Sequence, residues 1–321
     1  MHVLRTPDDR FAGLRGFDFE PHYVEVASPD GGADGGVEAI RVHYLDEGPR
    51  SASETVVCLH GEPSWSYLWR KVVPVVVGAG HRVVAPDLVG FGRSDKPAAR
   101  TDHTYARHVE WLRAALFDEL ALDDLTLVCQ DWGGLLGLRL VAEHPDRFRR
   151  VVAANTGLPT GDGRMTDAFV SWQRFSQEVP VLPIGRILRG GTVVDVADDV
   201  VAAYDAPFPD ERYKEGARQM PALVPTHPDD PAADANRRAW AALGEFDRPF
   251  LCAFSDGDPI TRGAERRFIE VVPGAAAQDH VTITGAGHFL QEDKGEELAA
   301  VVAAFIDRTP GPTRATPPAV T

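Results

Sequence analysis

The sequence predicts an α/β fold, with a mostly parallel central sheet flanked by helices and interrupted by a helical insertion. Three observations support this. Short β-rich runs alternate with segments of helical periodicity, as they do in βαβ units. Several runs, such as TVVCLH and LTLVCQD, are mostly apolar without alternating polar positions, which is typical of strands covered by helices on both faces. The alternation stops after Asn155 and resumes at Pro249.

Eight runs have the composition of strands. Residues 22–27 and 39–48 are expected to open the sheet as an antiparallel pair, and the core strands are expected over residues 55–60, 81–87, 125–131, 149–156, 249–256 and 280–285. Helical periodicity covers residues 67–77, 105–120 and 132–144. Residues 296–306 predict a closing helix, because their apolar residues fall along one stripe.

The interruption predicts a second domain. Residues 158–236 contain helical stretches and many prolines but no clear strand, and an insertion of that length must fold over something. We therefore expect a helical cap over 158–236, inserted between core segments 1–157 and 237–308. The tail, 309–321, has four prolines and little to bury, so we expect it to be disordered.

Composition narrows the function. The net charge of −15 disfavours nucleic acid and anionic membrane as partners. No run approaches the roughly 20 apolar residues of a membrane span, and the first residues lack the apolar region of a signal peptide. Cys58, Cys129 and Cys252 lie in apolar runs without zinc-site spacing, which indicates reduced, buried thiols. The cytoplasm is the expected location, with no metal.

The most informative segment is LTLVCQDWGGLLGLRL, an apolar strand followed by Asp131, two glycines and an apolar helix. It resembles a nucleophile elbow, the strained strand-to-helix turn that exposes one side chain. A serine there would need a base before it could attack, whereas an aspartate carboxylate is ionised at neutral pH. A carboxylate can displace a leaving group from carbon and leave an ester. The alternative is that Asp131 only caps the following helix.

A second segment lies one strand–helix–strand unit upstream. His60-Gly61-Glu62-Pro63 directly follows an apolar strand and resembles the H-G-x-P turn of α/β hydrolases. In that turn the backbone N–H of Glu62 would join that of Trp132 to hold an oxyanion. Alone, the segment could be an ordinary Gly-Pro turn.

Two further segments complete a triad. Asp258 lies just past the strand PFLCAFSD, and His288 just past the following strand. The chain order Asp131, Asp258, His288 is nucleophile, acid, base, and all three follow strand carboxyl ends, where α/β sheets build their sites. Asp256 competes for the acid position. We favour Asp258 because Pro259 follows it, as in many relatives of this fold.

Together these stretches, with HYLDEG, PDLVGFGRSDKP, AYDAPFPDERY and GAGHFLQED, resemble the haloalkane dehalogenases of the α/β-hydrolase superfamily over nearly the whole chain. The closest match is the subfamily with H-G-E-P and an Asp-His-Asp triad. The resemblance implies an α/β-hydrolase fold with an inserted helical cap. One departure is Gly134, where close relatives carry serine or another small residue.

The resemblance also assigns residues around the triad. It implies that Trp132 and Trp172 hold the departing halide, which suits indole N–H groups because they donate without carrying net charge. Packing is the alternative role for Trp172, since Phe169 and Phe175 partly share its helical face. The substrate pocket is expected to be lined by apolar side chains: Phe169, Leu135, Met220, Pro221, Val224 and Ile260.

The predicted reaction is hydrolytic dehalogenation through an alkyl ester of Asp131, which needs a small haloalkane and water, releases halide, and requires no cofactor or metal. An epoxide hydrolase is the closest alternative, because it shares the aspartate and the histidine. That reaction needs cap hydroxyls as acids, and Tyr204 and Tyr213 are the candidates in the cap. A ligand receptor without catalysis is a third possibility, which the intact triad disfavours.

Overall fold

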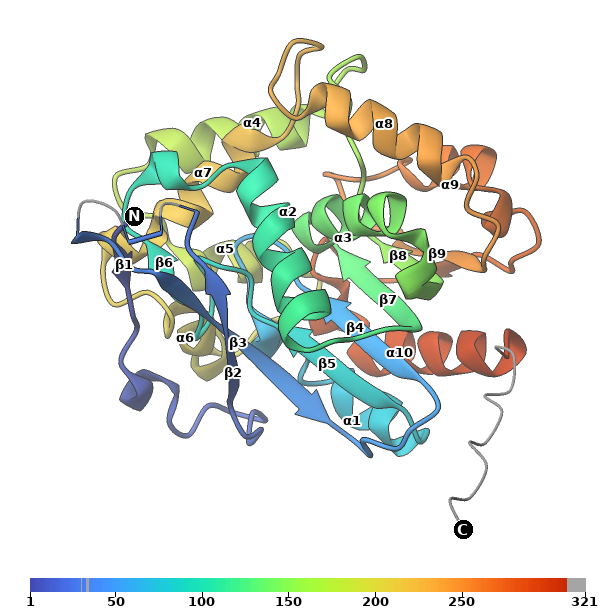
Figure 1. Cartoon of the computed structure of the whole chain (residues 1–321), viewed down its shortest axis with the longest axis horizontal. Helices are drawn as coiled ribbons and strands as arrows, with labels where there is room; N and C mark the ends of the chain where they lie inside the picture. Colours follow the sequence, from blue (N-terminus) through green and yellow to red (C-terminus); the bar gives the residue numbers. More distant parts are fainter. Residues whose placement is uncertain (30, 33–34, 311–321) are drawn as a thin grey trace.

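The computed structural model describes residues 1–29, 31–32 and 35–310 (Figure 1). Its centre is an eight-stranded sheet in the order β10-β9-β8-β7-β4-β5-β3-β2. β2 (His22–Ala27) and β3 (Ala39–Glu47) form the expected antiparallel pair, and β3 is also antiparallel to β5. The remaining pairs are parallel, and they join β4 (Thr55–Leu59), β5 (Arg82–Pro86), β7 (Leu125–Gln130), β8 (Phe148–Ala154), β9 (Phe250–Ser255) and β10 (Val281–Ile283).

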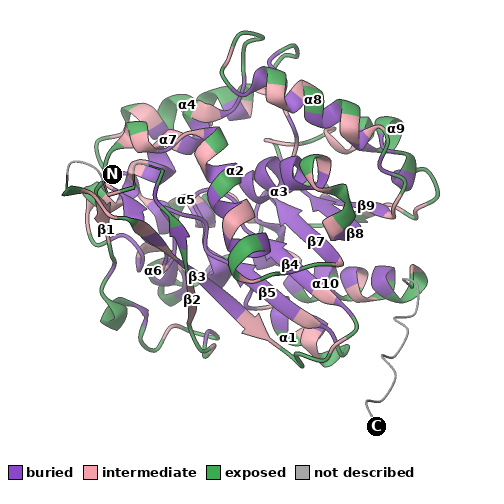
Figure 2. Cartoon of the chain, in the orientation of Figure 1, coloured by how far each residue is buried: buried purple, intermediate pink, exposed green. Residues whose placement is uncertain are grey.

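Helices cover both faces of this sheet. α1 (Val73–Gly78) and α10 (Leu290–Arg308) pack together on one face, and α2 (Tyr105–Arg113) and α3 (Trp132–Glu143) pack together on the other (Figure 1). α9 (Glu265–Val271) packs on β9. The central strands are therefore almost wholly buried (Figure 2), and every residue of β7 is buried. The predicted α/β class and its mostly parallel sheet are confirmed.

Some predicted helices begin or end elsewhere. The segment 67–77 is a 3₁₀ turn, Ser66–Trp69, followed by α1, which starts at Val73 because Pro74 suits a first helical turn. The helix expected to end at residue 120 ends at Arg113 and continues as a π-helical turn, Ala114–Glu119. The closing helix starts earlier, at Leu290. A two-stranded sheet of β1 (Val3–Leu4) and β6 (Lys96–Pro97) was not predicted.

The insertion between β8 and β9 is helical. It contains α4 (Asp167–Glu178), α5 (Ile184–Gly190), α6 (Asp198–Asp205), α7 (Glu215–Leu223) and α8 (Ala233–Leu243). α4 pairs with α7 and α5 with α6, whereas α8 packs on α3 of the core (Figure 1). The predicted cap boundary at residue 236 falls inside α8 and stays a prediction. Of the predicted disordered tail, residues 311–321 lie outside the described residues.

A buried carboxylate ties the insertion to the core. Glu292, in the first turn of α10, is 2% exposed and accepts hydrogen bonds from the Arg70 guanidinium and the Tyr204 hydroxyl. Tyr204 belongs to α6 of the insertion, and Arg70 follows the 3₁₀ turn after β4. Lys71 Nζ lies 3.3 Å from Glu292 Oε2. The insertion thus contacts the core through a charged, hydrogen-bonded cluster.

The cysteine prediction is confirmed, because Cys58, Cys129 and Cys252 are all buried and free. Burial raises the pKa of each thiol above its ordinary value, so none is a ready nucleophile. Among the described helices, none combines the length and the apolar character that crossing a bilayer requires.

Candidate active site

Asp131 occupies the turn between β7 and α3 and has the strained backbone angles φ +50° and ψ −124°. Glycines on either side make the turn possible. A Cβ on Gly133 would lie 2.1 Å from the carbonyl oxygen of Leu59, and one on Gly61 would lie 2.4 Å from Asp131 Oδ1. The glycines therefore let the helix pack closely on the sheet while Asp131 is held out of it, which is the geometry of a nucleophile elbow.

Two groups contact the Asp131 carboxylate. The backbone N–H of Glu62 donates to Oδ1 over 2.8 Å, and His288 Nε2 lies 3.5 Å from Oδ2. The first contact places one predicted oxyanion donor directly at the carboxylate. The second places the predicted base on the opposite oxygen, within reach of a water molecule that would attack the carboxyl carbon.

His288 is held from its other side by Asp258. Its Nδ1 lies 3.0 Å from Asp258 Oδ2, and Asp258 is only 1% exposed. The same carboxylate accepts hydrogen bonds from the N–H groups of Ile260 (2.8 Å) and Thr261 (3.3 Å) and from the Thr261 hydroxyl. The competing Asp256 is exposed and accepts instead from the N–H of Gly285 over 2.8 Å. This geometry favours Asp258 over Asp256 as the acid.

Charge stabilises this arrangement. Burial alone would lower the pKa of His288, but the charges and hydrogen bonds of Asp258 and Asp131 outweigh burial and raise that pKa to about 10. Burial opposes ionisation of Asp258, yet the imidazolium and the hydrogen bonds around it lower the pKa of Asp258 to about 2. In the resting protein His288 is therefore cationic between two carboxylates.

Two amide side chains that the sequence analysis missed position His288. The Gln130 amide nitrogen lies 3.1 Å from His288 Nε2. Asn155 Nδ2 donates to Ser255 Oγ (2.8 Å) and to the carbonyl oxygens of Gly287 (2.9 Å) and His288 (3.0 Å). Gln130 is the last residue of β7, and Asn155 directly follows β8. A polar residue at the carboxyl end of a core strand could therefore have identified both as site residues.

Asp131 and His288 line a cavity of about 630 Å³. Both predicted halide ligands, Trp132 and Trp172, line it as well. So do five of the six predicted pocket residues: Phe169, Leu135, Pro221, Val224 and Ile260. Met220 is fully buried and does not line the cavity. Pro221 lies in the last turn of α7 and Val224 directly follows the helix, and the helical turn carries the neighbouring Met220 away from the cavity.

The Trp132 indole differs from two other buried indoles. Trp65 Nε1 donates to the carbonyl oxygen of Ala203 and Trp240 Nε1 to that of Leu158, whereas Trp132 Nε1 donates to no described residue. An uncommitted indole N–H facing a cavity is suited to an anion. Trp172 is half-buried and lies against Phe175, with ring centroids 6.1 Å apart.

The Glu62 side chain is a further feature that the sequence analysis missed. It lines the cavity at 3% exposure, and its Oε1 has no hydrogen-bond partner among the described residues. Burial and the nearby charge of Asp131 raise the pKa of Glu62 well above its ordinary value. These effects favour the neutral form of the carboxyl group, which repels a nearby anion less than a carboxylate would.

Comparisons with known proteins agree with this geometry. A family model described as the alpha/beta hydrolase fold matches residues 54–178. The haloalkane dehalogenase of Psychrobacter cryohalolentis is 56% identical, over 97% of this chain and 100% of that protein. The haloalkane dehalogenase of Mycobacterium marinum is 52% identical, over 93% of this chain and 98% of that protein.

A solved tetrameric structure of a haloalkane dehalogenase from Paraglaciecola agarilytica superposes with a TM-score of 0.86 at 38% identity. The alignment covers 95% of this chain and 98% of that one. Identity above half along nearly the whole length, together with the shared fold, shows the family. The chain belongs to the haloalkane dehalogenase family of the α/β hydrolases.

Proposed function

We propose that this protein hydrolyses the carbon–halogen bond of haloalkanes, with Asp131 as a covalent nucleophile. The observation that carries the proposal is an aspartate at the elbow, with His288 Nε2 3.5 Å from its Oδ2. Asp131 attacks the halogen-bearing carbon, the carbon–halogen bond breaks, and halide leaves toward the indole N–H groups of Trp132 and Trp172. Water then hydrolyses the ester, so that alcohol and a proton leave and the carboxylate is restored.

The charge state of His288 follows this sequence. In the resting protein the Asp131 charge helps to hold His288 protonated, with a pKa of about 10. Alkylation converts the Asp131 carboxylate into a neutral ester, which removes that contribution and lowers the pKa of His288. The imidazole can then accept a proton from water, while Asp258 supports the cation that forms. The N–H groups of Glu62 and Trp132 would hold the oxyanion at the ester carbon.

The rest of the site supports a neutral, apolar substrate. Residues 158–236 form the proposed cap, which supplies Trp172, Phe169 and Pro221 to the cavity. An epoxide hydrolase would need a hydroxyl acid there, but no tyrosine is among the described residues that line the cavity. Tyr204 is buried and donates to Glu292. Buried, free cysteines support the cytoplasm as the proposed location.

The test is turnover of matched substrates. The purified protein is incubated with 1-bromobutane, 1-chlorobutane, 1,2-dibromoethane and 1,2-epoxybutane, and halide and diol are measured. We expect halide from the haloalkanes and little diol from the epoxide. Asp131→Ala should abolish halide release, whereas Asp256→Asn, which changes an exposed neighbour, should preserve it. Diol release without halide release would overturn the proposal.

A further inference from the structure

The cavity reaches the surface beside three arginines. Besides Asp131 and His288, its lining includes the exposed residues Arg164, Arg262 and Arg267. The two carboxylic residues of the lining, Glu62 and Asp131, are buried or half-buried. Since exposed lining residues mark the opening of a cavity and buried ones its depth, the arginines form the mouth and Asp131 lies inside.

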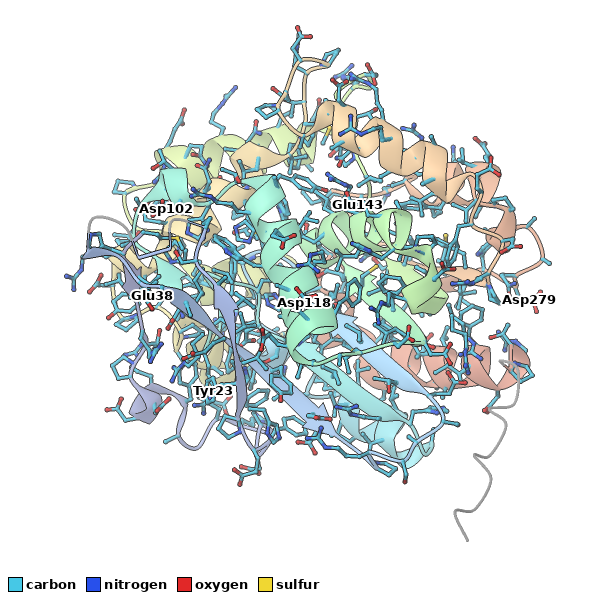
Figure 3. The ribbon with its side chains drawn as sticks, in the orientation of Figure 1. Tyr23, Glu38, Asp102, Asp118, Glu143 and Asp279 are labelled. Atoms are coloured by element: carbon cyan, nitrogen blue, oxygen red, sulfur yellow. The ribbon has the colours of Figure 1, made fainter. Side chains whose placement is uncertain are left out.

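This mouth has the opposite charge to the molecule. The chain carries a net charge of −15, and acidic side chains such as Glu38, Asp102, Asp118, Glu143 and Asp279 come from separate elements around the surface (Figure 3). The exposed charged residues that line the cavity are all arginine, and one of them, Arg164, is paired with an acid outside the lining, Asp167. A local cluster of positive charge at a cavity entrance concentrates anions there, even on an acidic protein.

The three arginines differ in their polar partners among the described residues. Arg164 forms a salt bridge with Asp167 (3.0 Å), and Arg262 donates to the carbonyl oxygen of Asp256 (3.0 Å). Arg267 makes neither a salt bridge nor a side-chain hydrogen bond with any described residue. Asp162 is the acid whose charge acts on Arg267.

Asp162 forms its salt bridge with a different arginine. Its carboxylate is held by Arg237, with Nε 3.0 Å from Oδ2. All five N–H donors of the Arg267 guanidinium are therefore free for a ligand.

An aromatic stack holds this guanidinium in place. Its central carbon lies 4.1 Å from the centroid of the Trp240 ring. Trp240 is fixed by a 2.7 Å hydrogen bond from Nε1 to the carbonyl oxygen of Leu158, and it stacks on Phe268 at 5.0 Å and 26°. Stacking occupies one face of a guanidinium and leaves the N–H groups at its edge, which match a planar carboxylate.

We infer that Arg267 binds the carboxylate of substrates whose opposite end carries the halogen, which makes ω-halocarboxylates of sufficient chain length a substrate class. The inference rests on the proposed function and extends it. The reaction is X–(CH₂)ₙ–COO⁻ + H₂O → HO–(CH₂)ₙ–COO⁻ + X⁻ + H⁺. The carboxylate stays at the exposed mouth, so its charge is never buried, while the alkyl chain crosses the apolar lining to Asp131.

The test compares ω-bromocarboxylates of four to ten carbons with 1-bromoalkanes of equal length, in wild type, Arg267→Gln and Arg267→Lys. Arg266→Gln is the matched control, because Arg266 is an exposed neighbour on α9 that does not line the cavity. Arg267→Gln should lower kcat/KM for the long bromocarboxylates roughly tenfold or more, as expected for one charge-assisted hydrogen-bonded pair. It should leave the bromoalkanes unchanged. For the shortest bromocarboxylates, kcat/KM should not depend on Arg267, because these molecules cannot reach from Arg267 to Asp131.

Equal losses for both substrate series in Arg267→Gln would overturn the inference, since they would mean that Arg267 assists halide exit or folding. The inference would also be overturned if wild type had equal kcat/KM for ω-bromocarboxylates and 1-bromoalkanes at every chain length. Binding of decanoate, measured calorimetrically against 1-decanol, separates this inference from the proposed function. If no haloalkane is hydrolysed, the proposed function fails, and decanoate binding that is lost in Arg267→Gln but kept in Arg266→Gln still supports the site.

Discussion

Replacing His288 by phenylalanine should separate the two chemical steps. Asp131 is ionised and needs no base, so alkylation by 1-bromobutane should stay within roughly tenfold of wild type. Ester hydrolysis does need the base, and its loss should slow that step by roughly 10²–10⁴-fold. The variant should therefore release about one bromide per protein molecule and stop. Rapid-quench halide measurement gives the burst, and mass spectrometry of peptides should locate the butyl group on Asp131.

The structure indicates that this variant will fold. Phenylalanine fills a similar volume, and Asp258 loses His288 but keeps the N–H groups of Ile260 and Thr261 and the Thr261 hydroxyl. Losing one charged partner of a buried, otherwise hydrogen-bonded group should cost about 1–3 kcal/mol of stability. Asp131→Ala should show neither burst nor adduct. If the histidine variant folded and bound substrate but gave no burst, a base would be required before attack, and the nucleophile assignment would be refuted.

Three further predictions concern the surrounding groups. Bromide should quench tryptophan fluorescence saturably, and Trp172→Phe should weaken that saturation, whereas linear quenching unchanged by the substitution would indicate collisions only. Asp258→Asn should reduce turnover about 10⁴-fold, because His288 loses both orientation and charge support, while Asp256→Asn should be far milder in the same assay. Because the pKa of Glu62 is raised, bromide affinity should fall as rising pH ionises that group, and Glu62→Gln should remove this dependence in bromide titrations. If bromide affinity still depended on pH in Glu62→Gln, that dependence would be assigned to His288.

How far the sequence predicts the fold depends on whether a signal is local. β7 was predictable because LTLVCQ is apolar at nearly every position, and a strand covered on both faces has no polar side. The elbow was predictable because its glycines lie only two and three positions after Asp131. By contrast, the two-residue strands β1 and β6 are too short to show a period, and the break before α1 depends on Pro74 opening a helix rather than ending one.

The parts of the site that were missed depend on long-range contacts. Asn155 reaches the loop of His288, 133 residues away, and no local pattern encodes that hydrogen bond. The Glu62 side chain is notable only because the fold buries it beside Asp131. Met220 was misplaced because its apolar character does not reveal which side of α7 faces the cavity. Arg267 carries no signal at all until Trp240, Asp162 and the cavity mouth are located.

The cluster around Glu292 has a consequence for how molecules enter and leave. Lifting the cap would pull the Tyr204 hydroxyl from a carboxylate that is 2% exposed. A hydrogen bond to a charged group contributes roughly 1.5–3 kcal/mol, so this contact favours the position in which the insertion lies against the core. The more often the insertion keeps this position, the more the shape and charge of the cavity opening decide which compounds reach Asp131.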